Sequence, residues 1–125
     1  MATLDLSQRA TIRRDKHPRF ETELSCHFEK DVRSELTEEL KECFEKNHEL
    51  RLILPEQWTI YFKLRTAGSS RLSLAHPSEK EWVATIALSP EHARAVLEQL
   101  RTDASLRISD LGTTSGLINF SLLID

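Results

Sequence analysis

The sequence predicts an α+β fold in which two helices pack on a single antiparallel sheet, a two-layer sandwich built from a meander and a C-terminal hairpin. The prediction rests first on residues 81–88, where apolar side chains recur with the period of two of a half-buried strand. It rests second on the change at Ser89, Pro90 and Glu91, which suit a helix cap, a first helical position and the positive helix end. The apolar stripe of this second helix comprises Ala93, Val96, Leu97 and Leu100.

The N-terminal residues look different from the rest of the chain. Residues 1–18 contain few core-forming side chains and end at Pro18, so we expect a flexible basic arm there and a single domain over residues 19–125. Residues 20–28 alternate like a strand, but their phenylalanines and Leu24 also recur every fourth residue like a helix. We favour a strand over residues 20–28, with a helix as the alternative.

Residues 30–47 have helical spacing. Two ion pairs at i,i+4, Glu29 with Arg33 and Glu42 with Lys46, would support this first helix. Asn47 suits its end. Its apolar stripe comprises Val32, Leu36, Leu40, Cys43 and Phe44.

The remaining elements are strands. A short apolar run over residues 50–54 stops at Pro55, and residues 58–65 form the most regular alternation in the chain. Turns over residues 66–70 and 76–79 flank Leu72 and Leu74 and make a consecutive three-strand meander that ends with residues 82–88. The predicted C-terminal hairpin comprises a strand marked by Leu106 and Ile108, a turn over residues 112–116 and a strand over residues 117–124.

Composition excludes several classes of protein. The 125 residues carry 17 Lys and Arg against 20 Asp and Glu, a net charge of −3, so nothing in the overall charge attracts nucleic acid or acidic membranes. We therefore expect neither nucleic acid nor a membrane as a partner. Without a secretory leader or a long apolar run, we expect the protein to be cytoplasmic.

No group of residues has the spacing of a catalytic or metal site. Cys26, His27, Cys43 and His48 lack the two close pairs of a structural zinc site, and Cys43 falls on an apolar helix stripe near acidic residues. We expect no metal, no cofactor and no catalytic residue, and so no enzyme. His17, His76 and His92 are interpreted as surface histidines.

Basic side chains form one candidate binding site for an anionic small ligand. Lys63 and Arg65 should lie beside Arg71 across the turn at Gly68 and could hold a phosphate by charge-assisted hydrogen bonds. The alternative is that these basic residues bind no ligand and form a charged face that keeps the sheet solvated. The candidate ligand-binding residues are Arg13, Arg14, Arg19, Tyr61, Lys63, Arg65 and Arg71.

Residues 13–20, followed by the alternating Leu24, Cys26 and Phe28, resemble the opening of PilZ domains. In that family, paired arginines before the first strand bind a cyclic dinucleotide, and this is what the resemblance implies here. The pattern departs from the family in two ways. Arg14 and Arg19 are separated by four residues rather than three, and the Asp/Asn-x-Ser-x-x-Gly strand is missing from its expected place.

The leading functional expectation is a small non-enzymatic interaction or regulatory domain that contacts a protein partner or a second copy of itself, as a homodimer. It rests on Val83 and Ala87, which are apolar on the nominally outer face of a central strand and suggest a cover, either a helix or another subunit. The alternative is a sensor or binding module for a phosphate-bearing ligand such as a nucleotide or cyclic nucleotide.

Overall fold

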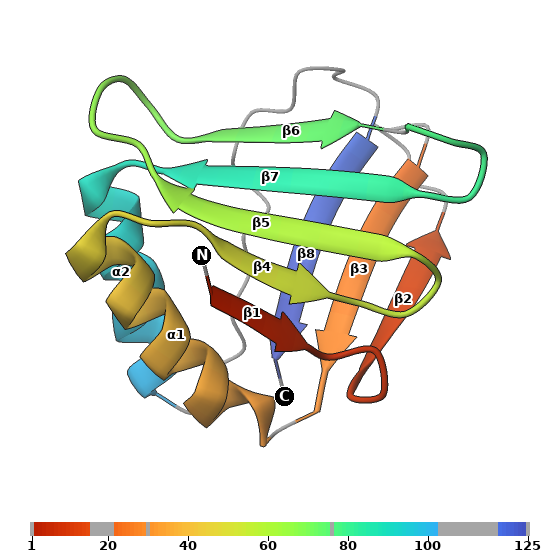
Figure 1. The fold of residues 1–125 in the computed structure, drawn as a ribbon, viewed down its shortest axis with the longest axis horizontal. Coiled ribbons are helices and arrows are strands. Elements are labelled where there is room, and N and C mark those ends of the chain that lie inside the picture. Colours follow the sequence, from red (N-terminus) through yellow and green to blue (C-terminus); the bar gives the residue numbers. More distant parts are fainter. Residues whose placement is uncertain (1, 16–21, 30, 76, 103–117, 125) are drawn as a thin grey trace.

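The computed structural model describes residues 2–15, 22–29, 31–75, 77–102 and 118–124. Within these residues the chain forms two helices and two β-sheets (Figure 1). The helices are α1 (Val32–Lys46) and α2 (Pro90–Arg101). The five-stranded sheet comprises, in order across the sheet, β1 (Ala2–Asp5), β4 (Leu50–Ile53), β5 (Trp58–Leu64), β7 (Trp82–Leu88) and β6 (Arg71–Ala75). The three-stranded sheet comprises β2 (Ala10–Asp15), β3 (Thr22–Phe28) and β8 (Ile118–Ile124).

Both predicted helices are confirmed, and the start of α2 and the end of α1 carry the expected signals. The Ser89 hydroxyl accepts a hydrogen bond from the amide of His92 at 3.3 Å, and Pro90 lies in the first turn of α2. Asn47 ends α1 in the left-handed conformation with φ of 52°. Local sequence therefore determines where α2 begins and where α1 ends.

Of the side chains predicted to form ion pairs along α1, Lys46 and Glu42 do so at 2.7 Å. Arg33 has a different role, because its guanidinium donates to the carbonyls of Gln99 at 3.4 Å and Thr102 at 3.0 Å. These carbonyls lie at the C-terminal end of α2, where the last backbone acceptors of a helix lack partners within it. Arg33 thus joins the two helices.

The predicted single antiparallel sheet is wrong. β5 runs parallel to β7, and β1 runs parallel to β4, so the five-stranded sheet is mixed. The predicted meander is also wrong, because β6 pairs on the far side of β7 and not between β5 and β7. Burial explains this order: β5 and β7 carry fully buried Ile60, Phe62 and Ile86 and lie inside the sheet, whereas β6 begins and ends with exposed residues and takes the edge.

The predicted C-terminal hairpin needs a second correction. Its last strand exists as β8, but β8 pairs in parallel with β3 in the second sheet rather than extending the first. The expected strand at residues 106–108 and the turn at 112–116 lie outside the described residues. The pairing also resolves the ambiguity at residues 20–28, since residues 22–28 are a strand.

The flexible arm predicted for residues 1–18 differs from the structure, where residues 2–5 and 10–15 form strands. β1 pairs with β4, β2 pairs with β3, and Leu6 between them is only 1% exposed. Arg9 contacts Asp31 at 3.1 Å and Glu35 at 3.0 Å, which ties the turn after β1 to the start of α1. These contacts hold residues 2–15 in the fold, although few of their side chains are apolar.

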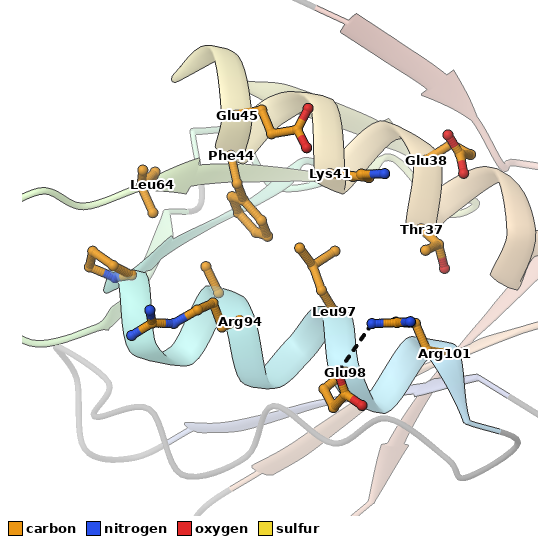
Figure 2. A pocket seen from close by; sticks show the side chains of 12 residues that line it. Thr37, Glu38, Lys41, Phe44, Glu45, Leu64, Arg94, Leu97, Glu98 and Arg101 are labelled. Atoms are coloured by element: carbon orange, nitrogen blue, oxygen red, sulfur yellow. Dashed lines mark ion pairs between the residues drawn. The ribbon is translucent and has the colours of Figure 1, made fainter.

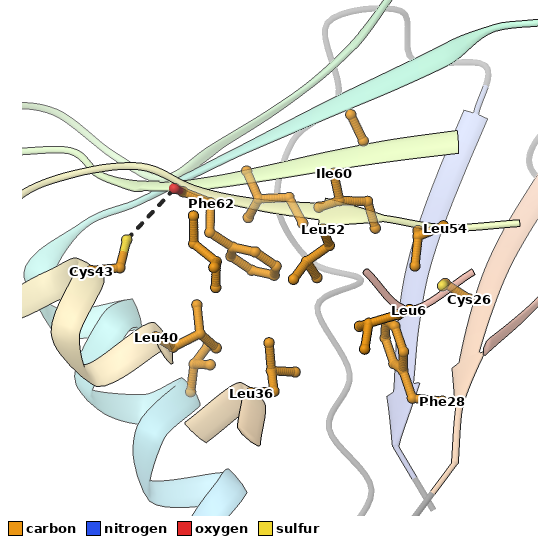
Figure 3. Close-up of a cluster of buried hydrophobic side chains, with 14 of the residues drawn as sticks. Leu6, Cys26, Phe28, Leu36, Leu40, Cys43, Leu52, Leu54, Ile60 and Phe62 are labelled. Carbon is orange, nitrogen blue, oxygen red and sulfur yellow. Dashed lines mark hydrogen bonds between the residues drawn. The ribbon is translucent and has the colours of Figure 1, made fainter. Parts of the chain in front are cut away.

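The core lies behind one face of the five-stranded sheet. Helices α1 and α2 cover one end of that face, and the three-stranded sheet crosses behind the other end (Figure 1). Figure 3 shows Leu36 and Leu40 of α1 pointing toward Phe62 of β5. Leu6 and Phe28 fill the region of the core next to the three-stranded sheet. The opposite face of the five-stranded sheet is covered by no described helix or strand (Figure 1).

Candidate functional site

The seven residues predicted to bind an anion do not all come together. Arg13 and Arg14 lie in β2, where they pair with Ser25 and Leu24 in the three-stranded sheet. Arg19 lies outside the described residues. The other four belong to β5, β6 and the turn between them in the five-stranded sheet.

Three of those four line one cavity of about 470 Å³ on the outer face of the five-stranded sheet. They are Lys63, Arg65 and Arg71. Its other lining residues are Leu64, Thr66, Ala67, Ser73, Thr85 and Ala87. The lining contains three cations and several hydroxyls but no carboxylate, so the charge of this basic cavity is positive.

Strand register explains how the cations converge. Lys63 of β5 and Arg71 of β6 both lie opposite Ala87 of β7, from its two sides. Lys63 and Arg71 were predicted to be direct neighbours across the turn, but β7 separates them. Tyr61, two residues before Lys63 in β5, pairs with Thr85 and does not line the cavity. The small Ala87 side chain, 7% exposed, forms the floor between the two long basic ones.

The turn at Gly68 orients Arg65. The Arg65 Nε donates a hydrogen bond to the carbonyl of Ala67 at 2.7 Å. Gly68 has φ of +86°, and a Cβ built there would lie 3.0 Å from a terminal nitrogen of Arg65. Glycine is needed here both for the backbone conformation and because the guanidinium packs against the bare backbone.

A second hollow lies between the two helices and was not recognised from the sequence. This interhelical groove has a volume of about 750 Å³ and is lined by residues of α1, α2 and the end of β5 (Figure 2). Phe44, Leu64 and Leu97 are partly buried against the core and remain open to the groove. The signal in the sequence was that Phe44 and Leu97 lie at the margins of their apolar stripes.

Charged side chains flank this apolar floor on both helices. The α1 rim carries Glu38, Lys41 and Glu45, and the α2 rim carries Arg94, Glu98 and Arg101. Figure 2 shows the helices running in opposite directions, with Glu38 near the Arg101 end and Glu45 near the Arg94 end. Arg101 also contacts Glu98 at 3.5 Å along its own helix.

No protein-family model and no curated protein matches this chain. The PilZ resemblance of residues 13–20 therefore gains no support beyond the local pattern.

A polar network at the start of α2 joins the β5–β6 turn to the helix. The amide of Ser89 donates to the Ser70 hydroxyl at 2.9 Å, and the Ser70 hydroxyl also contacts Nδ1 of His92. The two serine hydroxyls lie 3.3 Å apart. This contact of His92 was not predicted, because Ser70 is 22 residues away in the chain. Through this contact the β5–β6 turn, which lines the basic cavity, is held against the N-terminal end of α2.

The two cysteines are buried and free. Burial raises the pKa of the Cys43 thiol from 9.0 to about 11, and it raises the pKa of Cys26 still further. The Cys43 Sγ lies 2.8 Å from the carbonyl of His48. It lies 3.6 Å from the carbonyl of Phe62, the contact drawn in Figure 3. Both thiols are therefore in the protonated, unreactive form at neutral pH.

The described residues contain neither a group of metal ligands nor a helix that could cross a membrane. Among those residues, no three or more His, Cys, Asp or Glu side chains are grouped so that they could hold a metal ion. Neither described helix combines the length and the apolar composition needed to cross a membrane.

Proposed function

We propose that this chain is a non-enzymatic interaction domain that forms a homodimer through the interhelical groove between α1 and α2. The observation that carries the proposal is the pairing of an apolar floor with rims of complementary charge. Apolar side chains exposed together in a groove gain free energy when a partner covers them. The occupant is a second copy of the same groove.

Charge complementarity favours one arrangement of the two copies. A two-fold axis along the groove places α1 of one copy over α2 of the other and preserves each residue's position along the groove. Glu38 then faces Arg101, and Glu45 faces Arg94, at the two ends of the groove. At its centre, Lys41 of one copy meets Glu98 of the other.

The other two-fold arrangement is disfavoured by like charges. An axis across the groove places α1 over α1 in antiparallel orientation, so that Glu38 of one copy faces Glu45 of the other. It also places Arg94 opposite Arg101. The same charges that favour the first dimer therefore oppose the second, which is how interfaces select a register.

Charge reversal tests both the dimer and its geometry. One variant, E38R with E45R, makes both rims predominantly basic, and another, R94E with R101E, makes both predominantly acidic. We expect each variant alone to sediment as a monomer at concentrations where the unmodified protein is a dimer. A one-to-one mixture should restore the dimer, because each acidic rim then meets a basic one.

A matched control reverses a charge away from the groove. K80E alters an exposed lysine in the turn between β6 and β7 and should leave the dimer unchanged. A native protein that sediments as a monomer at about 100 μM, a concentration at which typical stable interfaces are saturated, would end the proposal. Variants that stay dimeric would place the interface elsewhere.

A further inference from the structure

We infer that the basic cavity on the outer face of the five-stranded sheet binds a small molecule through a phosphate group. This site lies on the face opposite the helices and is independent of the proposed dimer. Its positively charged residues are Lys63, Arg65 and Arg71, around the floor formed by Ala87.

The cations in the basic cavity have no acidic partner among the described residues. Arg9, Lys46 and Arg101 each contact a carboxylate within 4 Å. Within the described residues, no carboxylate forms an ion pair with Lys63 or Arg71, and the Arg65 side chain donates only to a backbone carbonyl. Three unpaired cations in a chain of net charge −3 repel one another, and a bound anion removes that repulsion.

The strand pairing gives the basic cavity a shape suited to a tetrahedral anion. Neighbouring strands lie about 4.8 Å apart, so the backbones of Lys63 and Arg71 are separated by about 10 Å with Ala87 between them. Two long side chains can close on a group of phosphate size from opposite sides. A sheet face that is merely solvated needs no such hollow, and its cations need not share one floor residue.

Hydroxyl groups complete the set of donors. Ser73 and Thr85 line the cavity from β6 and β7, where they face each other in register, and Thr66 lines it from the turn. Each can donate a hydrogen bond to a phosphate oxygen. The Arg65 guanidinium is fixed by its bond to Ala67 and by packing on Gly68, so less conformational freedom is lost on binding.

The test uses the full chain titrated with inorganic phosphate, pyrophosphate, AMP and adenosine, followed by amide chemical shifts and by calorimetry. We expect saturable binding of at least one phosphate-bearing probe, none of adenosine, and shifts confined to residues 63–73 and 85–87. Stronger binding of AMP than of inorganic phosphate would identify a nucleotide as the source of the phosphate. Equal binding would identify the phosphate group alone.

Three variants separate a built site from general charge attraction. K63Q and R71Q should each weaken binding about tenfold or more, as expected for loss of a charged hydrogen bond. A87L should weaken it similarly with all charges retained, because the leucine occupies the floor. The control K80Q removes an exposed lysine far from the basic cavity and should bind like the unmodified protein.

Thermal unfolding of each variant shows that its fold is intact, and K63Q remains informative if A87L fails to fold. Equal binding by K63Q, R71Q and K80Q would overturn the inference, because the attraction would then be non-specific. Absence of saturable binding of all phosphate-bearing probes, or shifts only elsewhere, would overturn it too. Binding of an RNA oligonucleotide without binding of any small probe would contradict the small-molecule site.

Discussion

Trp58 and Trp82 stack with ring centroids 5.2 Å apart and an interplanar angle of 8°. They are the first residues of β5 and β7, which pair in parallel, and they face each other in register. Trp58 is 1% exposed and belongs to the core, whereas Trp82 is partly buried at its edge. The stacked pair thus fixes the start of the parallel pairing that the sequence did not reveal.

Replacing Trp82 by alanine should destabilise the protein by about 2–3 kcal/mol, since it removes a stacked pair and part of the buried surface. Trp58→Ala should cost more, about 3–5 kcal/mol, because the buried side chain leaves a cavity. Urea unfolding measures both. A Trp82→Ala variant that unfolds like the native protein would show that the stacking contributes nothing to stability.

Two serines, Ser70 and Ser89, contribute to the stability of the N-terminal end of α2. Ser89→Ala removes the side-chain cap and should cost about 1 kcal/mol. Ser70→Ala should also cost about 1 kcal/mol, because it leaves the Ser89 amide without its 2.9 Å acceptor. The double variant should cost less than the sum, since the two hydroxyls share one network. Strict additivity in denaturant unfolding would argue against that coupling.

Gly68→Ala should destabilise the protein by about 1–2 kcal/mol, because φ of +86° is unfavourable for a residue with a Cβ. It should also move the Arg65 guanidinium, which a Cβ would approach to 3.0 Å. Ser69→Ala in the same turn is the matched control and should have little effect on thermal unfolding. Equal stability of the two variants would contradict the conformational role given to Gly68.

The buried cysteines should make stability depend on pH at alkaline values. The folded state keeps Cys43 protonated, with its pKa raised from 9.0 to about 11, so it releases this proton less readily than the unfolded state. The thiol contribution is therefore complete below about pH 9 and is lost as the pH rises through 11. Unfolding free energies of the native protein and of Cys26→Ala with Cys43→Ala should show a smaller alkaline decrease in the variant. Parallel curves would contradict the burial of both thiols.

Much of the secondary structure could be predicted because its signals are local. The helix cap at Ser89 and the helix end at Asn47 each depend on a few neighbouring residues. Both lie at the positions predicted from the sequence. The alternation over residues 58–64 likewise identified Ile60 and Phe62 as inward-facing, since side chains on a strand alternate between faces.

The residues of the candidate sites could be predicted from the sequence only in part. Lys63, Arg65 and Arg71 were grouped because they are close in the chain, but their common floor, Ala87, comes from a strand that the predicted meander placed on the wrong side. Ala87 was interpreted as apolar surface that a helix or a subunit covers. It is instead enclosed between two basic side chains, and no described helix lies over it.

The sequence by itself determined the two helices and most strands after residue 20, with the apolar face of the helices, because periodicity and capping act over a few residues. It did not determine the strands at residues 2–5 and 10–15. Only the tertiary structure decided that β5 pairs with β7, that β8 joins β3, and that residues 2–15 enter both sheets. Strand partners are chosen by competition for burial among segments distant in the chain. An alternating pattern records that a strand has a buried face, but it does not record which neighbours bury it.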